Sequence, residues 1–441
     1  MREYTIERGT ALTPETIADI IRAFEQHDLP KLEKYNRYYE GVQAITAKAS
    51  EDPSKPCNRI VANYCYNIAK NYSGYMTGVP ISYASQQKDF EQVQDILKYN
   101  DSKTADAQFL LNALKYGVAY EILYLDETAH TRFAVLDSRQ VIPLYANDLT
   151  GDLLAAIRYY PVQTWDGDVI TRYNVDVYTD REIAHYITAD RLTGMECIDT
   201  DAHYFGQVPI NPFWLNDDGV AIYDRIMSLQ DAYNTLLSSE VDDFEAFCDA
   251  YLVLTGVQAE PEDIAAMKKN RVLLLDDDSA ASYLTKSTTD TQIENMLRNI
   301  NDQIHKVSNS PDFNDEKLLA QSGIAMRYKL LGFENNAGDI EAHMRKALQR
   351  RIELICTILN LTGADAVWRD IDIVFTRNLP VNVVESAQIV NSLRGIVSDK
   401  TLLAQLPFVE DPGKELEQLE AETGRKAEVF AFRTGVMEND E

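Results

Sequence analysis

The apolar positions of the first hundred residues recur mainly at helical spacing. Thr13 is suited to cap a helix that has Pro14 at its first position. The apolar stripe that follows consists of Ile17, Ile20, Ile21 and Phe24. A second helical stripe, which ends before Gly78 and Pro80, consists of Ile60, Tyr64, Ile68 and Tyr72. A short strand is predicted next, at residues 81–83.

Strand-like alternation dominates the second hundred residues, after a predicted helix at residues 103–116. Residues 119–137 predict two strands that pair across a turn near residues 126–128. Further strand-like segments are residues 153–162, 173–179 and 181–188. The chain up to residue 215 is therefore predicted to be one α+β domain.

The pattern becomes helical again in residues 219–251, which contain no proline and no glycine after Gly219. This predicts one helix of about 30 residues, roughly 45 Å long. A second helix is predicted at residues 289–307, with an apolar face of Ile293, Leu297, Ile300, Ile304 and Val307. Residues 252–288 between them hold two apolar runs around a short helix. Two helices that flank a small mixed module predict a stalk with a knob at its end.

Residues 309–338 combine a loop rich in Asn, Asp, Ser and Pro with a helix. Ser310 before Pro311, or Asn314, is suited to cap this helix. One face of the helix carries Leu319, Gly323, Met326, Leu330 and Phe333. Gly323 costs about 1 kcal/mol relative to Ala, which indicates a kink or a close backbone approach. A catalytic lid, a hinge and a part that touches a passing polymer all fit this segment.

The remaining residues predict a helix at 339–361 and a strand within residues 370–380, which Pro380 ends. Two or three short helices and an acidic tail follow. The signals that bound these helices are Ser398, Asp411 with Pro412, and Gly424.

Composition adds one strong feature, an excess of acid. Of 441 residues, 45% are hydrophobic, which marks a folded chain with two to four structural units. The 42 Lys and Arg against 70 Asp and Glu give a net charge of −28, which argues against a conventional nucleic-acid binder that neutralises phosphates. The acidity serves either solubility or a surface along which a polyanion slides without being held. No signal peptide and no transmembrane helix is expected.

No catalytic constellation stands out, and we predict no enzyme, no metal and no cofactor. The five cysteines have no metal-type spacing and suit a reducing cytosol. The six histidines match no metal motif. Lys400 and Thr401 follow Gly395 too closely for a phosphate loop, and the second glycine is missing. The acidic triplet at residues 276–278 is suited either to a divalent cation or to a solvated turn.

A few isolated basic residues are suited to contact phosphates only if the chain forms a ring. Lys268, Lys269 and Arg271 lie in the insert, and Arg327 and Lys329 lie on the helix after the loop. In a single chain they are exposed side chains. Repeated around an axis, each would become a charged collar that meets phosphates without binding them permanently.

Several stretches of the chain form a recognisable series: residues 35–45 (YNRYYEGVQAI), 58–83, 115–127 (KYGVAYEILYLDE), 322–335 (SGIAMRYKLLGFEN) and 398–422. They resemble the portal proteins of long-tailed bacteriophages of Gram-positive hosts. They occur in the family's order and extend over nearly the whole chain.

The resemblance implies a mainly helical α+β portal fold that forms a ring with a central channel. The implied parts are a wing (1–215), a first stem helix (216–250), a clip (251–288), a second stem helix (289–307), a tunnel loop and helix (308–338), a helix and strand that return to the sheet of the wing (339–380), a crown (381–424) and a tail (425–441).

The resemblance further implies a ring, usually of twelve subunits, at one capsid vertex of the virion. Terminase, a separate ATPase, packages double-stranded DNA through the channel, and the DNA is later ejected. Further implied partners are the major capsid and scaffolding proteins and a head–tail adaptor, with no membrane and with assembly in the cytoplasm of the bacterial host. Because salt screens charge beyond about 8–10 Å, only the acidic residues of the lining would keep the DNA from sticking.

The resemblance also implies two sets of site residues. Those of the DNA channel are Ser308, Asn309, Ser310, Asp312, Phe313, Asn314, Asp315, Lys317 and Lys329. Those of the clip, which would contact terminase and the adaptor, are Glu260, Glu262, Asp263, Lys268, Lys269 and Arg271.

Two alternatives from other classes remain open. One is a metal-dependent nuclease that uses the acidic triplet at residues 276–278. The other is a different head assembly protein, such as a monomeric adaptor or a scaffold. The long helix with a helical partner after an insert favours packing in a ring over this second alternative.

Overall fold

The chain divides into two compact units, residues 1–377 and residues 378–441. The computed structural model describes the chain apart from residues 1–3, 51, 54, 167, 189–191, 193, 249–250, 256–279, 285–289, 314–322, 379–389, 404–405, 407–408, 410–411, 414, 417, 420 and 422–441. In the described part, no helix is long and apolar enough to cross a membrane.

The first helix of the first unit lies where the sequence predicts it. In α1 (Pro14–His27) the side chain of Thr13 accepts a hydrogen bond from the backbone N–H of Thr16, so the predicted cap is confirmed. The apolar stripe of α1 is buried except for the half-buried Ile20. Further along the chain lie α2 (Leu29–Tyr39), η1 (Ala44–Ala47) and α3 (Tyr64–Thr77).

A three-stranded sheet contains the predicted hairpin. β3 (Val118–Leu125) pairs antiparallel with β4 (Thr131–Leu136), and β10 (Ile210–Trp214) pairs with the other edge of β3. Before this sheet in the chain come β2 (Ser82–Ala84), α4 (Phe90–Tyr99) and α5 (Ser102–Tyr116), and η2 (Ser138–Gln140) follows β4.

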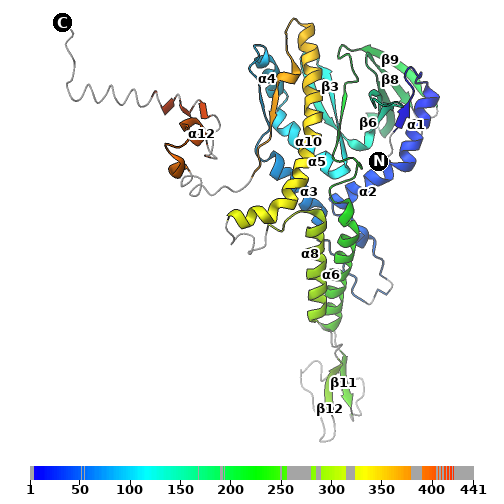
Figure 1. Ribbon diagram of the computed structural model, residues 1–441. Helices are drawn as coiled ribbons and strands as arrows, with labels where there is room; N and C mark the ends of the chain where they lie inside the picture. The colour runs from blue at the N-terminus through cyan, green and yellow to red at the C-terminus, as the bar shows by residue number, and fades with distance from the viewer. Residues whose placement is uncertain are drawn as a thin grey trace, which may run out of the picture. The chain divides into compact units, whose positions relative to one another are not determined.

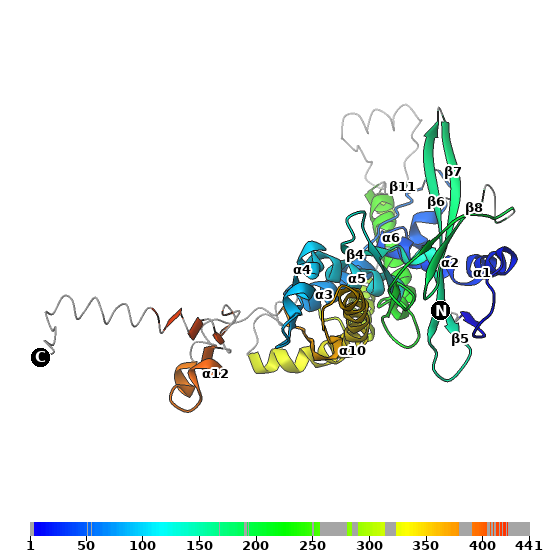
Figure 2. The same cartoon turned by 90° about the horizontal axis from the view of Figure 1, so that it is seen from above.

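The predicted strands of residues 153–188 lie in a six-stranded sheet with the order β1-β5-β6-β7-β8-β9. β1 (Tyr4–Ile6) is parallel to β5 (Val141–Ala146), and all other neighbours are antiparallel. The other strands are β6 (Leu153–Asp166), β7 (Asp168–Tyr178), β8 (Glu182–Thr188) and β9 (Glu196–Ala202). This sheet lies on one side of the long helix α10 (Gly323–Leu361), with α3 and α4 on the other (Figure 2).

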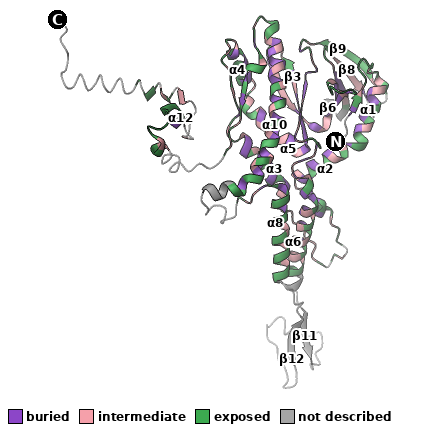
Figure 3. Ribbon diagram, viewed as in Figure 1, coloured by how far each residue is buried: buried purple, intermediate pink, exposed green. Residues whose placement is uncertain are grey.

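The predicted stalk is present as an antiparallel pair of helices, α6 (Met227–Cys248) and α8 (Asp290–Ser308), which pack against each other (Figure 1). We call this pair the stalk. Along the chain, β11 (Tyr251–Thr255) and β12 (Ala280–Leu284) lie between its two helices and form a two-stranded antiparallel sheet. Most described residues of the stalk are half-buried or exposed (Figure 3).

The first stalk helix is shorter than predicted, 22 residues or roughly 33 Å. Residues 219–226 form a turn and the short helix η3 (Asp224–Ile226) instead. Asn216 holds this turn through its side chain, which donates to the carbonyl of Val220 and accepts from its N–H. The backbone of Gly219 packs so closely on Gly117 that a Cβ there would lie 2.6 Å away. Close packing on α5 and β3 therefore replaces the first predicted helical turns.

The two helices predicted at residues 310–338 and 339–361 are one continuous helix in the structure, α10, of 39 residues. Its first part runs sideways and the remainder runs upward in Figure 1. Leu330 and Phe333 of the predicted apolar face are buried. After η4 (Trp368–Asp370), the predicted last strand is present as β13 (Asp372–Val374). It pairs with β2, a strand of the first 215 residues, in a two-stranded sheet.

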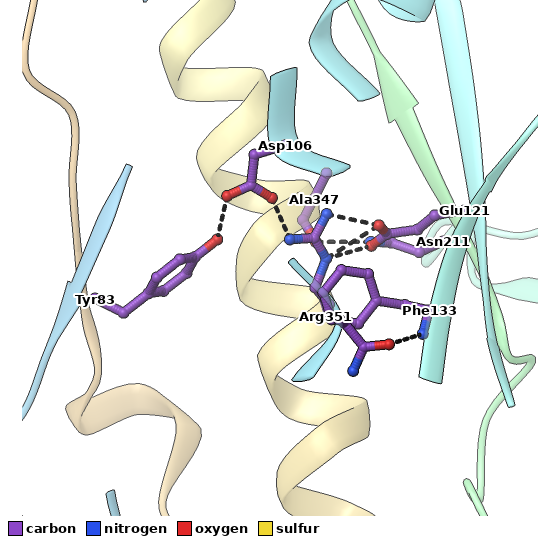
Figure 4. Close-up of polar contacts among 8 residues, drawn as sticks. Tyr83, Asp106, Glu121, Phe133, Asn211, Ala347 and Arg351 are labelled. Carbon is purple, nitrogen blue, oxygen red and sulfur yellow. Dashed lines mark hydrogen bonds and ion pairs between the residues drawn. The ribbon is translucent and has the colours of Figure 1, made fainter. Parts of the chain in front are cut away.

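A buried ion network fixes α10 against the rest of the first unit (Figure 4). The guanidinium of Arg351 pairs with Glu121 on β3, at 2.7 Å, and with Asp106 on α5. Tyr83 donates to Asp106 at 3.0 Å, and Phe133 lies 4.4 Å from the guanidinium. These contacts join α10 to β2, α5 and the three-stranded sheet at a single point.

The second unit has one described helix longer than four residues, α12 (Asp399–Leu403). Ser398 accepts a hydrogen bond from the N–H of Thr401 at 3.4 Å, which confirms the predicted cap. Gly424 lies outside the described residues.

Candidate functional site

A polar stripe follows one face of α6 at four-residue spacing. Its members are Gln230, Asn234, Ser238 and Asp242. Each accepts a hydrogen bond from a backbone N–H of residues 58–64: Tyr64 to Gln230 (3.0 Å), Ala62 to Asn234 (2.9 Å), Ile60 to Ser238 (3.0 Å) and Asn58 to Asp242 (2.6 Å). Four helical residues rise about 6.0 Å and two extended residues about 6.6 Å, so the two repeats match. We call this arrangement the polar ladder.

The polar ladder is buried at its upper end and fully hydrogen-bonded there. Gln230, Asn234 and Ser238 are all 0% exposed. Asn234 also donates to Gln43 at 2.5 Å, and Gln230 donates to the carbonyl of Ala62 at 2.7 Å. Because unsatisfied buried amides are costly, these contacts hold residues 58–64 in one register on the stalk. Ile60 consequently lies in this segment and not in the helical stripe predicted for it.

The end of α8 is anchored below α10. Tyr72 of α3 is fully buried, and its hydroxyl donates to the carbonyl of Ser308 at 3.1 Å and accepts from Asn336 of α10 at 2.8 Å. Burial raises the pKa of Tyr72 to about 12, so the hydroxyl keeps its proton at neutral pH. One buried side chain therefore connects three helices.

The residues that follow α8 are held by backbone contacts. Nδ1 of His305 lies 2.8 Å from the carbonyl of Ser310, and since a carbonyl only accepts, this nitrogen carries the proton. Asn309 has a φ of 52°, a left-handed conformation that Asn tolerates. Its side chain lies 3.2 Å from the position of a Cβ added at Gly332. Gly332 of α10 therefore permits a close approach. The surroundings of Gly323, for which the sequence indicates a kink or a close approach, lie outside the described part of the chain.

An aromatic cluster completes this anchorage. The ring of Phe333 lies 4.3 Å from that of Tyr72, 4.8 Å from that of Tyr75 and 6.0 Å from that of Phe313. Next to it, Tyr75 donates to Glu334, which also pairs with Arg377 at 3.0 Å. We call Ser308, Asn309, Ser310, Pro311, Asp312 and Phe313 the root segment.

A cavity of about 450 Å³ opens beside the root segment. Its polar lining includes Asn67, Asn71, Asn301, His305 and Asp312. Among the described residues, no three His, Cys, Asp or Glu side chains form a group that could hold a metal ion. The geometry of this region is that of a mechanical anchor: it fixes where the chain leaves the stalk and enters α10.

Comparison with known proteins identifies the family. Residues 18–429 match the family model described as phage portal protein, SPP1 Gp6-like. The chain belongs to this phage portal protein family. It is similar to the portal protein of Bacillus phage SPP1, with 24% identity over 463 aligned positions, 97% of this chain and 91% of the relative. It is also similar to the portal protein of Clostridium phage phiCD119, with 24% identity over 395 positions, 83% of this chain and 85% of the relative.

The structure separates the predicted channel residues of this portal-family chain into two groups. Ser308 and Ser310 are 5% and 0% exposed, so their side chains are buried within this chain. Asn309, Phe313 and Lys329 are exposed and Asp312 is half-buried. Asn314, Asp315 and Lys317 lie outside the described residues.

The predicted clip residues all lie outside the described residues, as does the acidic triplet at residues 276–278. The polar ladder was missed in the sequence, although its signal is visible there. Four polar residues at four-residue spacing share one face of the helix, and such a stripe requires a hydrogen-bonding partner if it is buried.

Proposed function

We propose that this chain forms a ring, of twelve subunits, at one capsid vertex of the virion, and that double-stranded DNA passes through its central channel. Terminase packages the DNA, which is later ejected, and the ring is the platform for head–tail joining. The observation that carries the proposal is an antiparallel stalk with an anchored root segment at its base, in a chain that matches the portal family from residue 18 to residue 429.

The exposure of the stalk supports lateral neighbours. Among its described side chains, residues 239–245 of α6 and 291–303 of α8 include no buried residue. Phe244 and Met296 are 68% and 52% exposed. Two helices leave part of their apolar faces exposed. In a four-helix bundle, a third and a fourth helix pack against those faces and bury them. Copies of the chain arranged around an axis supply those helices.

The arrangement at the root segment supports a channel lining. The buried Ser308 and Ser310 fix the position of the chain, and the exposed Asn309 and Phe313 stand at its surface. We place these two, with Asp312, Asn314, Asp315, Lys317 and Lys329, nearest the DNA. The net charge of −28 keeps most of the ring repulsive toward phosphate, so that DNA moves without being held.

The proposed channel lining is tested by shortening the chain directly after the root segment. A chain that lacks residues 314–320 should still form rings, since the polar ladder and root segment are intact, but capsids built with it should stay empty. A matched chain with Gly and Ser at these seven positions keeps the length and separates length from chemistry. The readout is DNA per capsid; normal filling with the shortened chain would contradict the proposal.

The clip is proposed to contact terminase and later the head–tail adaptor through Glu260, Glu262, Asp263, Lys268, Lys269 and Arg271. Charge reversal at Lys268, Lys269 and Arg271 together should weaken terminase binding in a pull-down. Reversal of Lys31 and Lys34 on α2 serves as the control. If the clip variant retains both partners, these residues are not the contact.

A further inference from the structure

A groove with unsatisfied polar atoms lies between α10 and the β1–β5–β6 end of the large sheet. Its volume is about 680 Å³. Its walls include Thr5 of β1, Tyr145 of β5, Leu153 of β6, Trp214 of β10 and Trp368 of η4. Neither the family match nor the proposed channel assigns a role to it.

The floor of the groove contains an acceptor without a partner. Asn211 is 0% exposed, and its Nδ2 donates to Glu121 at 2.6 Å and to the carbonyl of Ala347 at 2.8 Å (Figure 4). Both of these partners only accept, so the orientation of the amide is fixed. Its Oδ1 has no hydrogen-bonding partner among the described residues.

A donor without a partner lines the same groove. Arg350 donates through its two terminal nitrogens to Gln207 at 2.7 Å and to the carbonyl of Val208 at 3.0 Å. Its Nε has no partner among the described residues. Asn211 contacts α10 at Ala347, one turn before Arg350. The groove thus has one free acceptor and one free donor. A backbone amide group offers one donor and one acceptor, so it is the complement of this pair.

One basic side chain at the rim of the groove is free to meet a carboxylate. Lys346 is exposed and makes no ion pair with a described residue. Of the acidic groups at the rim, Asp148 and Asp152 are both paired with Arg8, at 2.8 and 2.5 Å, and Glu353 accepts from Gln207 at 3.1 Å. Lys346 is therefore the charged side chain at this rim that has no partner among the described residues.

The opposite end of the same sheet carries a segment of matching chemistry. β9 is the last strand of the sheet, and all seven of its residues are exposed. It contains three carboxylates, Glu196, Asp199 and Asp201, and its outer edge offers backbone amides that pair with no described strand. The unpaired N–H and C=O groups of an edge strand are a template for pairing with another chain.

We propose that β9 of a second copy of this chain occupies the groove, with its backbone amides over Asn211 and Arg350 and its carboxylates at Lys346. The contact rests on the ring proposed above and deepens it, because groove and strand lie at opposite ends of one sheet. Such a head-to-tail contact repeats from copy to copy, and it gives a ring where the rotation between copies closes.

Cross-linking of the purified full-length chain tests this contact. Cys197 of β9 is exposed, and Gln349 lines the groove and is exposed. A Gln349→Cys variant treated with a short bismaleimide should give a ladder of dimers, trimers and larger species on a denaturing gel. Removal of the native thiol by Cys197→Ser should abolish the ladder. Asp339→Cys, exposed on the same helix and outside the groove, is the matched control.

The cross-linking pattern and the particle mass together test both the contact and the ring. A ladder that requires both the thiol introduced at position 349 and Cys197 of a neighbouring copy supports the contact, whereas a pattern that stops at dimers contradicts its head-to-tail form. Rings of the expected mass without a ladder would overturn this inference alone, and a water molecule would then satisfy Asn211 and Arg350. A chain that stays monomeric at every concentration would contradict the inference and the proposed ring together.

Discussion

Arg351 carries one positive charge between two buried carboxylates, Asp106 and Glu121, and all three side chains are 0–2% exposed. Burial of these charges costs desolvation free energy. The attraction between the paired charges offsets that cost, so the network adds little net stability. What the network provides is position: α10 packs against the three-stranded sheet in one register. The neutral partners Tyr83 and Asn211 complete the hydrogen bonds of the two carboxylates.

Arg351→Met should destabilise the first unit by about 3–5 kcal/mol, because it leaves two carboxylates buried without a cation. The control is Arg298→Met, which removes an exposed ion pair with Glu294 (2.8 Å) and should cost less than about 1 kcal/mol. Urea denaturation of both variants gives the comparison. Equal losses would show that the network is not important for stability.

Tyr72→Phe should lower the free energy of unfolding by about 1–2 kcal/mol, because the carbonyl of Ser308 and the amide of Asn336 both lose a buried hydrogen-bonding partner. The aromatic packing on Phe333 is retained. Hydrogen exchange should become faster at the amides of the root segment, and Tyr66→Phe on the exposed face of the same helix should change nothing. Unaltered exchange in the Tyr72 variant would rule out the anchoring role.

Elements are held together by side chains that act on the backbone of a neighbour, and the polar ladder is the main case. Asn234→Leu should leave the N–H of Ala62 and the Oε1 of Gln43 without hydrogen-bonding partners. Each unsatisfied group should lower the free energy of unfolding by about 1–3 kcal/mol. Thr235→Val, on the exposed face of the same helix, is the control. Urea unfolding together with hydrogen exchange at Ala62 measures the effect. A Leu variant as stable as the Val variant would mean that residues 58–64 are not fixed by the ladder.

The close contact of Gly117 with the turn before α6 gives a second prediction for elements. Gly117 and Gly206 both have positive φ, 83° and 66°, so Ala at either site suffers a similar left-handed strain of about 1–2 kcal/mol. At Gly117 the new Cβ would also lie 2.6 Å from the backbone of Gly219, whereas at Gly206 nothing lies within 4 Å. Gly117→Ala should therefore lose clearly more stability in urea, and equal losses would contradict the close packing.

Elements also show what the sequence predicts and what it does not. The cap at Thr13, the hairpin β3–β4 and the stalk follow from local periodicity and capping, because those signals act within a few residues. The length of α6 and the single helix α10 depend on distant contacts, at Gly117 and at Arg351, which no local pattern contains. The polar ladder joins residues far apart in the chain, such as Asn58 and Asp242. The root segment also depends on a distant residue, because Tyr72 donates to the carbonyl of Ser308. The sequence therefore predicts where this segment lies in the chain but not its orientation.

At the scale of the whole molecule, the stalk, the edge strand β9 and the groove beside Arg350 are all surfaces that a single copy leaves uncovered. An acidic chain of net charge −28 repels other copies at low salt, so assembly of the ring should be favoured by moderate salt, which screens this repulsion. Assembly measured by light scattering between low and moderate salt checks the direction, and dissociation on addition of salt would contradict it.

The mass of the purified chain, measured together with electron micrographs of the same particles, tests the central claim most directly. The account predicts a particle close to twelve times the chain mass of 50.0 kDa, with a hole along its axis. Addition of scaffolding and capsid proteins provides the second condition, for a ring that closes only with its partners. A monomer under both conditions, or a particle without a central hole, would contradict the channel.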